Sequence, residues 1–426
     1  LLELPDELLV EIIEGAAEDT SRSYRKPCDT CSACRDFPGL DKSRLKNLAT
    51  VCSRFSRIVQ PLLFRKISFW GERMELPARK LLRLRDALKE NPQFHSYCRC
   101  VKLHISDYGR SDQRTVADDL PEWLTKTRCL QLHGGFDDRK EKTGNASTWA
   151  LLNRFGINCK QIEHLCLGRE GWGLYLTNVL ANLNFPNLKT LDIHGISKWK
   201  QGTVTLEPER LRTAPFTSLA LSDYEESPEA TSLLIQWPAV LTHFIFESFY
   251  NNPHIMDYPM FESWLLIHKD TLKHVQMGYL SRRRGGRRLF NATLFPHLEF
   301  LGLSRWQSDE ESLKSEADIA NLLGPSVKTF LWDFGINDQH PEDWSDFEEL
   351  EETWIRRLAQ AAIDTKAALT TIRIQFDPYE WYSEDYKYYP WDRMDSIKDD
   401  ICDPNGLALI YSEPCVTKEE WLKNFQ

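Results

Sequence analysis

Pairs of apolar residues separated by one position recur along most of the chain, and this recurrence constrains the fold more than any other feature. Two segments are nearly self-similar, residues 185–193 (FPNLKTLDI) and residues 295–303 (FPHLEFLGL). Most intervals between successive pairs are 25 to 31 residues, and the two longer intervals require insertions. Such a period is typical of a stacked array of repeats. The pairs are Leu103/Ile105, Leu130/Leu132, Leu165/Leu167, Leu191/Ile193, Leu219/Leu221, Phe244/Phe246, Val275/Met277, Leu301/Leu303, Phe330/Trp332 and Ile372/Ile374.

Each pair alternates with other residues in the manner of a short strand with one buried face. Patterns with helical spacing lie between the pairs, at residues 174–183, 229–237, 261–269, 319–323 and 350–368. Each unit therefore predicts a strand, a loop and a helix. The LxxLxL core of the two similar segments resembles the leucine-rich repeat. The predicted fold class is α/β, a solenoid with a curved parallel sheet on its concave side and helices outside.

An ordinary βα domain with a wound sheet is the alternative to a solenoid. It predicts longer strands and a glycine-rich nucleotide turn, and the sequence has neither. The motifs GxGxxG, GxxxxGK[ST], GxSxG and HExxH are also missing from the sequence. No pair of carboxylates stands out as an acid/base couple. We therefore expect a protein that is not an enzyme.

The first seventy residues carry further helical patterns. In the first pattern, Pro5 and two acidic residues favour the start of a helix. Pro61 is expected to interrupt the second pattern and to start a short last turn at residues 62–64. The apolar positions are Leu8, Leu9, Ile12 and Ile13 in the first pattern, and Leu45, Leu48, Val51, Cys52, Phe55 and Val59 in the second. So small a unit cannot bury this surface alone, which indicates either a helical cap on a larger domain or a docking module.

Three motifs in this region together resemble the F-box. They are LPDELLVEI at residues 4–12, LKNLATVCSRF at residues 45–55 and LLFRKI at residues 62–67. In that family the module binds the Skp-type adaptor of a cullin–RING ubiquitin ligase. The resemblance implies that the adaptor contacts are made or supported by Leu4, Pro5, Leu8, Ile12, Leu48, Val51 and Phe55.

An F-box followed by leucine-rich repeats is a familiar combination, and residues 81–105 further resemble the filamentous-fungal members. The resemblance implies a substrate receptor of an SCF (Skp–cullin–F-box) ubiquitin ligase. The F-box would bind the adaptor and through it the cullin, and the repeats would bind a protein target for ubiquitination. Two alternatives remain open. The chain could be a cullin-independent interaction scaffold, or a small-molecule or zinc-dependent sensor that uses the same repeat surface.

An insertion at residues 19–40 separates two helices that are closely connected in a usual F-box. A longer surface loop costs little entropy, although this loop could also obstruct the adaptor. The insertion contains cysteines at CxxC spacing, which can place two thiolates on one zinc ion. The candidate ligands are Cys28, Cys31, Cys34 and Cys52, with His95, Cys98 and Cys100 as later alternatives. Free thiols in a loop are the other interpretation, so zinc is an option and no cofactor is required.

Aromatic and charged residues follow the predicted strands, where a solenoid presents the edge of its concave face. Tyr, Trp and Arg combine a large contact area with a polar tip and dominate binding hot spots. A basic run at residues 282–288 can hold phosphate or an acidic segment. The candidate substrate contacts are Tyr108, Tyr224, Tyr250, Tyr279, Arg305, Trp306, Arg283 and Arg287. Alternatively, the rings pack the loops over the core, and the basic run is a solvated loop.

The composition limits the partners and the compartment. A formal charge of -10 does not favour a general grip on nucleic acid, and no apolar run is long enough to span a membrane. The eleven cysteines are scattered and odd in number, which favours reduced thiols in an intracellular protein, cytoplasmic or nuclear. The start at Leu1 lacks a methionine and matches neither a signal peptide nor a transit peptide, so we expect a trimmed chain.

The expected organisation has four parts. The F-box occupies residues 1–69, with its insertion at 19–40. A helical linker and the N-terminal cap of the solenoid follow at residues 70–100. The leucine-rich repeats, with about ten strands, span residues 101–376. An aromatic loop and a C-terminal cap occupy residues 377–426.

Overall fold

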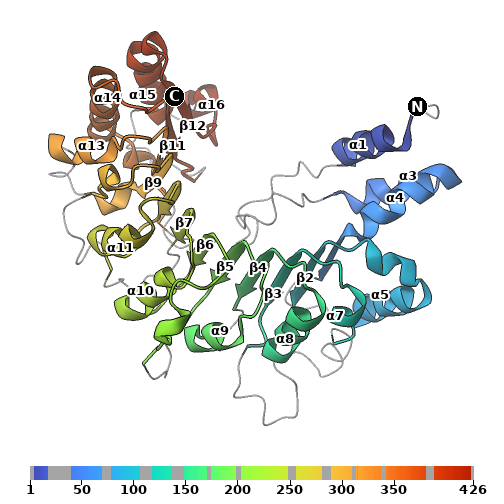
Figure 1. The fold of residues 1–426 in the computed structure, drawn as a ribbon. Helices are drawn as coiled ribbons and strands as arrows, with labels where there is room; N and C mark the ends of the chain where they lie inside the picture. The colour runs from blue at the N-terminus through green and yellow to red at the C-terminus, as the bar shows by residue number, and fades with distance from the viewer. Residues whose placement is uncertain are drawn as a thin grey trace. The chain divides into compact units, whose positions relative to one another are not determined.

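The computed structural model divides the chain into two compact units, Leu1–Val204 and Thr205–Gln426. Within each unit, parallel strands pair in chain order and helices lie between successive strands (Figure 1). This confirms the expected α/β repeat architecture in each unit. No helix in the described ranges is long and apolar enough to cross a membrane. The structure describes residues 4–17, 40–69, 78–105, 118–136, 148–169, 174–197, 203–247, 256–280, 289–308, 313, 315–336, 342–379 and 388–423.

The N-terminal unit begins with three helices, α1 (Asp6–Ala17), α3 (Lys42–Ala49) and α4 (Ser53–Arg65). Asp41 caps α3, because its side chain accepts hydrogen bonds from the backbone N–H groups of Ser43 and Arg44. We call these three helices the N-terminal helical module. Its core consists of Leu9, Ile13, Ala17, Leu45, Ile58, Val59 and Leu62.

Pro61 does not interrupt the second helical pattern, contrary to expectation. It lies inside the continuous helix α4. A proline inside a helix removes one backbone hydrogen bond and costs about 3 kcal/mol. Val59 and Leu62, on either side of Pro61, are buried in the core of the module. This apolar burial opposes the cost and keeps the helix continuous.

Helix α4 leads directly into strand β1 (Lys66–Phe69), with no residue between them. β1 pairs in parallel with β2 (Cys100–His104), so that Ile67 lies beside Val101. At the junction, the N–H of Arg99 donates a 2.9 Å hydrogen bond to the carbonyl oxygen of Arg65. The N-terminal helical module is therefore joined to the repeat sheet without an intervening linker.

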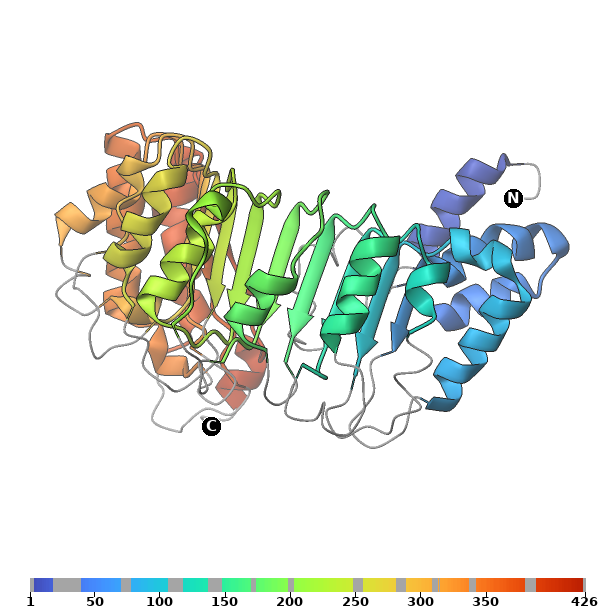
Figure 2. The same cartoon turned by 60° about the horizontal axis from the view of Figure 1, so that its bottom comes forward.

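The sheet of the N-terminal unit continues with β3 (Cys129–His133), β4 (His164–Gly168) and β5 (Thr190–His194). Figure 1 shows α7, α8 and α9 on one side of these strands, and Figure 2 shows the same arrangement from another direction. The helices of this part of the unit are α5 (Ala78–Glu90), η1 (Pro92–Ser96), α7 (Leu120–Trp123), α8 (Thr148–Asn158) and α9 (Leu176–Asn182).

The first apolar pair predicted from the sequence, Leu103/Ile105, lies two residues too far along the chain. Val101 aligns with Leu130 of the next strand, and Leu103 aligns with Leu132. The core pair of β2 is therefore Val101/Leu103, and Ile105 lies just beyond the strand. Residues 101, 103 and 105 are all apolar, so the sequence alone allowed either register. The hydrogen bonds to the neighbouring strand decide between them.

The C-terminal unit contains seven strands, β6 to β12, within the described residues. They are β6 (Ser218–Ser222), β7 (His243–Glu247), β8 (His274–Met277), β9 (Phe300–Ser304), β10 (Thr329–Asp333), β11 (Thr371–Gln375) and β12 (Ala408–Tyr411). The longer helices are α10 (Pro228–Gln236), α11 (Tyr258–Leu265), α13 (Glu316–Leu322), α14 (Glu349–Asp364), α15 (Pro390–Ile397) and α16 (Lys418–Lys423). The shorter helical segments are η3 (Pro208–Arg210), η4 (Leu266–His268), η5 (Ala292–Leu294), η6 (Arg305–Gln307), η7 (Trp344–Asp346), η8 (Lys398–Cys402) and η9 (Asp403–Asn405).

A repeated hydrogen-bond pattern marks the start of the strands. The N–H groups of Arg128 and Cys129 both donate to the carbonyl oxygen of Arg99. The N–H groups of Glu163 and His164 donate in the same way to the carbonyl oxygen of Arg128, and those of Lys189 and Thr190 to that of Glu163. The C-terminal unit repeats this pattern at Lys273, Glu299 and Lys328. Within each unit, these residues just before successive strands therefore lie in one row.

Candidate interaction surfaces

The N-terminal helical module exposes large apolar side chains. Leu8 and Ile12 of α1 are 46% and 47% exposed, and Val51, between α3 and α4, is 64% exposed. Leu8 and Ile12 are four residues apart, which places them on the same side of the helix, one turn apart. Leu9 and Ile13 fill the core of the module instead. The apolar residues of α1 thus form two rows, and only one row is needed to hold the module together.

The remaining predicted adaptor contacts lie nearer the core. Leu4, Leu48 and Phe55 are partly buried and pack against the core of the module. Pro5 is exposed. Leu4, Leu48 and Phe55 are therefore placed to support the exposed row from beneath.

Ion pairs fix α1 against α4. Asp6 accepts a hydrogen bond of 2.9 Å from Nε of Arg54 and another of 2.8 Å from Nη2 of Arg57. Nη1 of Arg65 lies 2.5 Å from Oε1 of Glu14 near the other end of α1. The hydrogen bond from Arg54 lowers the pKa of Asp6, with smaller contributions from the charges of both arginines. These contacts hold the exposed row of α1 in a fixed orientation.

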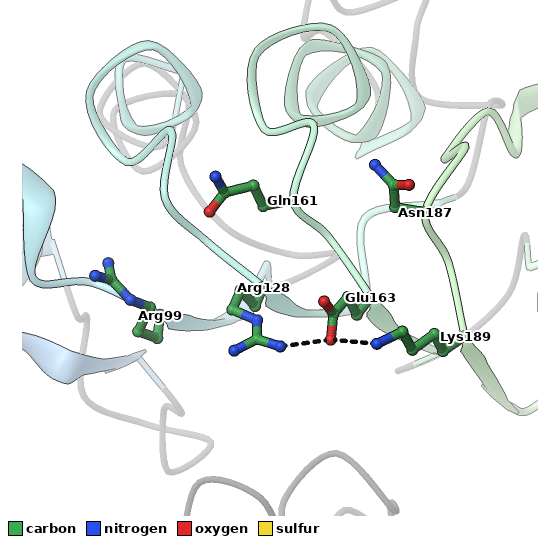
Figure 3. Close-up of a pocket in the computed structure, with 6 residues that line it drawn as sticks. All are labelled: Arg99, Arg128, Gln161, Glu163, Asn187 and Lys189. Carbon is green, nitrogen blue, oxygen red and sulfur yellow. Dashed lines mark hydrogen bonds and ion pairs between the residues drawn. The ribbon is translucent and has the colours of Figure 1, made fainter.

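A charged pocket of about 570 Å³ lies at the starts of β2 to β5 (Figure 3). The sequence patterns did not predict this pocket. Three of its side chains are basic and one is acidic. We call it the strand-start pocket, and its lining residues are Arg99, Arg128, Gln161, Glu163, Asn187 and Lys189.

The four charged residues of the pocket each come directly before a strand. The row at the strand starts therefore brings them together, although they are spread over 91 positions of the sequence, from 99 to 189. Oε2 of Glu163 lies 2.8 Å from Nη2 of Arg128 and 3.3 Å from Nζ of Lys189 (Figure 3). Burial alone would raise the pKa of Glu163, but its two basic partners lower it below the ordinary value. The pocket thus contains an ionised carboxylate shared by two cations.

Two predicted substrate contacts belong to the fold instead. Tyr224 is 0% exposed, and burial raises the pKa of its hydroxyl. Arg305 is buried and pairs with Glu351, with Nε and Nη2 lying 2.9 Å and 2.5 Å from Oε1. A side chain with no exposed surface cannot touch a target, so Tyr224 is removed from the candidate surface. Arg305 has its guanidinium committed to Glu351 and is removed as well.

Two other predicted contacts are half-buried at the ends of their strands. Nε1 of Trp306 donates a hydrogen bond of 2.5 Å to the carbonyl oxygen of Phe334, and its ring lies near the guanidinium of Arg305. Tyr279 is also half-buried. Part of each side chain therefore remains accessible. The other four predicted contacts, Tyr108, Tyr250, Arg283 and Arg287, lie outside the described residues.

The proposed zinc ligands are mostly outside the described residues as well, since Cys28, Cys31 and Cys34 fall there. Cys52 is a half-buried free thiol at the start of α4. Burial raises the pKa of the Cys98 thiol to about 12. In the described ranges, no three His, Cys, Asp or Glu side chains are grouped so as to hold a metal ion. Zinc at the cysteine insertion stays a prediction.

Comparisons with known proteins give little further information. No protein-family model matches the chain, and no curated protein matches it. A chain in the crystal structure of the Rad7 and Elc1 complex in yeast is 12% identical, with a TM-score of 0.38. That likeness covers 90% of this chain and 96% of the yeast chain. At this TM-score it carries no argument about fold or function.

Proposed function

We propose that this chain is the substrate-recognition subunit of an SCF-type ubiquitin ligase. The N-terminal helical module binds a Skp-type adaptor, and the repeats bind a protein target. The observation that carries this proposal is the exposed apolar row formed by Leu8 and Ile12, together with Val51 on the same module. The core of the module is complete without these three side chains.

Exposed apolar side chains of this size favour a partner surface. Burying a fully exposed side chain of this kind contributes about 1.5 to 3 kcal/mol. These three are roughly half exposed, so each gains roughly half of that on binding, and together they provide a substantial part of the affinity of a specific complex. The F-box resemblance of the same residues supports a Skp-type adaptor as that partner. The ion pairs of Arg54, Arg57 and Arg65 add to this argument, because they hold α1 in position before any partner arrives.

The direct join between α4 and β1 fits the role of a receptor. A ubiquitin ligase accelerates transfer by holding the target near the charged enzyme, so the receptor must fix the distance between adaptor and target. A helix that continues into the first strand of the repeat sheet provides such a fixed connection. In this proposal the chain supplies position, and the chemistry takes place on other subunits.

Co-expression with a fungal Skp-type adaptor, followed by size-exclusion chromatography, tests the proposal. We expect a stoichiometric complex with the wild type and loss of that complex with Val51→Asp. Ile157→Asp is the matched control, because Ile157 is 67% exposed on α8 of the same unit. If both variants retain the adaptor, the proposed docking surface is wrong.

Purification of the tagged chain from cells tests the remainder of the assembly. The receptor proposal expects cullin to co-purify with the adaptor. Recovery of the adaptor without cullin would instead favour a cullin-independent interaction scaffold.

A further inference from the structure

The two compact units carry opposite net charge. Residues 1–204 contain 32 Lys and Arg against 25 Asp and Glu, a formal charge of +7. Residues 205–426 contain 21 Lys and Arg against 38 Asp and Glu, a formal charge of −17. The whole-chain value of -10 conceals this division. The N-terminal unit therefore carries an excess of positive charge, which favours anions close to its surface although the chain as a whole is acidic.

The strand-start pocket concentrates this positive charge. It holds three cations, Arg99, Arg128 and Lys189, and one carboxylate, Glu163. Two of the cations share one oxygen of that carboxylate. Nη1 of Arg99 donates to the carbonyl oxygens of Ser96 and Cys98, at 2.5 Å and 3.1 Å. Among the described residues, Nε and Nη2 of Arg99 have no acceptor, so one edge of this guanidinium is available.

The same position in the C-terminal unit provides a comparison. There Lys328 also precedes a strand, and its Nζ lies 2.9 Å from Oε2 of Glu299. Both units thus place alternating charges at their strand starts, which helps to hold successive repeats in line. In the C-terminal unit Lys273 and Lys328 lie on either side of Glu299 in this row, as Arg128 and Lys189 do for Glu163. The N-terminal unit differs because Arg99 adds a third cation to the row.

We propose that the strand-start pocket binds an oxyanion carried by a partner polypeptide, either a phosphorylated side chain or a cluster of carboxylates. Arg99 and Arg128 supply the forked donors that suit such groups, and the exposed amide of Gln161 supplies a neutral donor. Nδ2 of Asn187 already donates to the carbonyl oxygen of Lys160 at 2.8 Å, which leaves its second hydrogen for an anion. That this partner is a protein target of the ligase rests on the proposed function. A nucleic acid fits less well, because no lining residue is aromatic and could stack on a base.

Glu163 sets the selectivity of this pocket. It pairs with Arg128 and Lys189, so an incoming anion has to compete with it. A single carboxylate gains little by replacing another carboxylate. A phosphate carries a charge of about −1.5 to −2 and three acceptor oxygens, and neighbouring carboxylates act together, so both compete better.

Fluorescence anisotropy with labelled peptides tests the proposal on the full chain at low salt. The probes are short flexible peptides of identical length that carry neighbouring phosphoserines, neighbouring glutamates or only serines. We expect the two anionic peptides to bind and the serine peptide not to bind. The phosphoserine and glutamate arms show which oxyanion the pocket prefers. Equal binding of all three peptides would overturn the proposal.

Three substitutions test the site, because each is expected to change the binding affinity in a different direction or not at all. Arg128→Gln should weaken binding about 3- to 10-fold, the range expected for one partly exposed charge-assisted contact. Glu163→Gln should tighten binding, because it releases Arg128 and Lys189. Lys328→Gln, at the equivalent position of the other unit, should leave binding unchanged. An Arg128→Gln variant that binds like the wild type, or no tightening in Glu163→Gln, would overturn the assignment.

Two further measurements distinguish binding at this pocket from a general attraction of anions to the basic unit. Arg154→Gln removes one charge elsewhere in the same unit, where Arg154 pairs with Glu122 on the helix side, and it should not change peptide binding. A single-stranded RNA of the same charge should bind more weakly than the phosphopeptide, and tighter RNA binding would contradict a polypeptide partner.

Arg128→Gln should still co-purify with the Skp-type adaptor, so loss of the anion site and failure of the adaptor proposal give different results.

Discussion

At the scale of single residues, Arg305 shows how a side chain typical of binding sites can serve the fold. Its guanidinium pairs with Glu351 and donates from Nη1 to the carbonyl oxygen of Ser308. Its central carbon also lies 5.4 Å and 5.8 Å from the ring centroids of Trp306 and Trp332. The sequence places Arg305 directly after a strand, where solenoids often bind partners. Only the contact with Glu351, 46 positions away in the sequence, identifies its structural role.

Replacing Arg305 should lower the unfolding free energy far more than replacing a lysine of an exposed ion pair. Arg305→Ala leaves the carboxylate of Glu351 buried without its cation, so we expect a loss of about 3 to 5 kcal/mol in unfolding free energy. Lys328→Ala breaks the exposed pair with Glu299 and should cost no more than about 1 kcal/mol. Urea denaturation of both variants measures this difference, and equal losses would contradict the structural role of Arg305.

Asp346 should make stability depend on pH. Burial raises its pKa to about 6, and the neighbouring charge of Asp343 acts in the same direction. Between about pH 4 and pH 6 the folded chain binds more protons at this site than the unfolded chain, so its contribution to stability is lost as pH rises. Asp346→Asn should remove this part of the pH dependence. Urea denaturation at the two ends of the window measures it, and an unchanged slope in Asp346→Asn would contradict the assignment.

At the scale of elements, the join between α4 and β1 couples the N-terminal helical module to the repeats. The rings of Phe64 and Phe94 stack beside this join, with their centroids 4.2 Å apart. The backbone N–H of Arg99 donates a hydrogen bond to the backbone carbonyl oxygen of Arg65. The module and the first strands of the N-terminal unit should therefore unfold together.

Inserting a short Gly-Ser segment between Arg65 and Lys66 should separate these two parts. We expect α1, α3 and α4 to exchange their amide hydrogens together with β1 and β2 in the wild type. In the insertion variant the helices should exchange faster than the strands. Hydrogen–deuterium exchange measured by mass spectrometry follows both sets of amides. Unchanged protection of the helices would mean that the join contributes nothing to their stability.

The elements also show what could be predicted from the sequence. The five predicted helices between the strands correspond to α9, α10, α11, α13 and α14, because each repeats its apolar residues at helical spacing. Strands β1 and β12 were not predicted. The alternation of β1 is only four residues long, and it overlaps the end of residues 62–67, whose pattern resembles part of an F-box. A pattern this short identifies a strand only when its pairing partner, here β2, is known.

Of the two candidate sites, one could be predicted in part from the sequence and the other could not. The apolar face of α1 follows from the spacing of Leu8 and Ile12, but the sequence could not show that Leu9 and Ile13, and not Leu8 and Ile12, would enter the core. The strand-start pocket could not be predicted, because each of its charges resembles an ordinary solvated residue in the sequence. Only the register of successive strands brings Arg128 and Glu163 to 2.8 Å.

At the scale of the whole molecule, the chain combines two kinds of candidate interaction surface. The N-terminal unit carries the exposed apolar row and the strand-start pocket together with a net positive charge. The C-terminal unit is acidic and carries its own exposed apolar residues, among them Ile410 and Leu422. A receptor needs separate surfaces for its adaptor and its target, and the N-terminal unit alone offers one apolar and one polar candidate.

Isothermal titration calorimetry of the purified chain with a purified Skp-type adaptor tests the central claim most directly. We expect one-to-one binding with a negative heat-capacity change, because apolar surface is buried. Leu8→Ser combined with Ile12→Ser should weaken binding about 100-fold, the value expected for two lost apolar contacts. Ile410→Ser combined with Leu422→Ser alters residues that are 49% and 46% exposed in the other unit, and it should bind like the wild type. Equal affinities for the two double variants, or no binding heat from the folded wild type, would contradict the account.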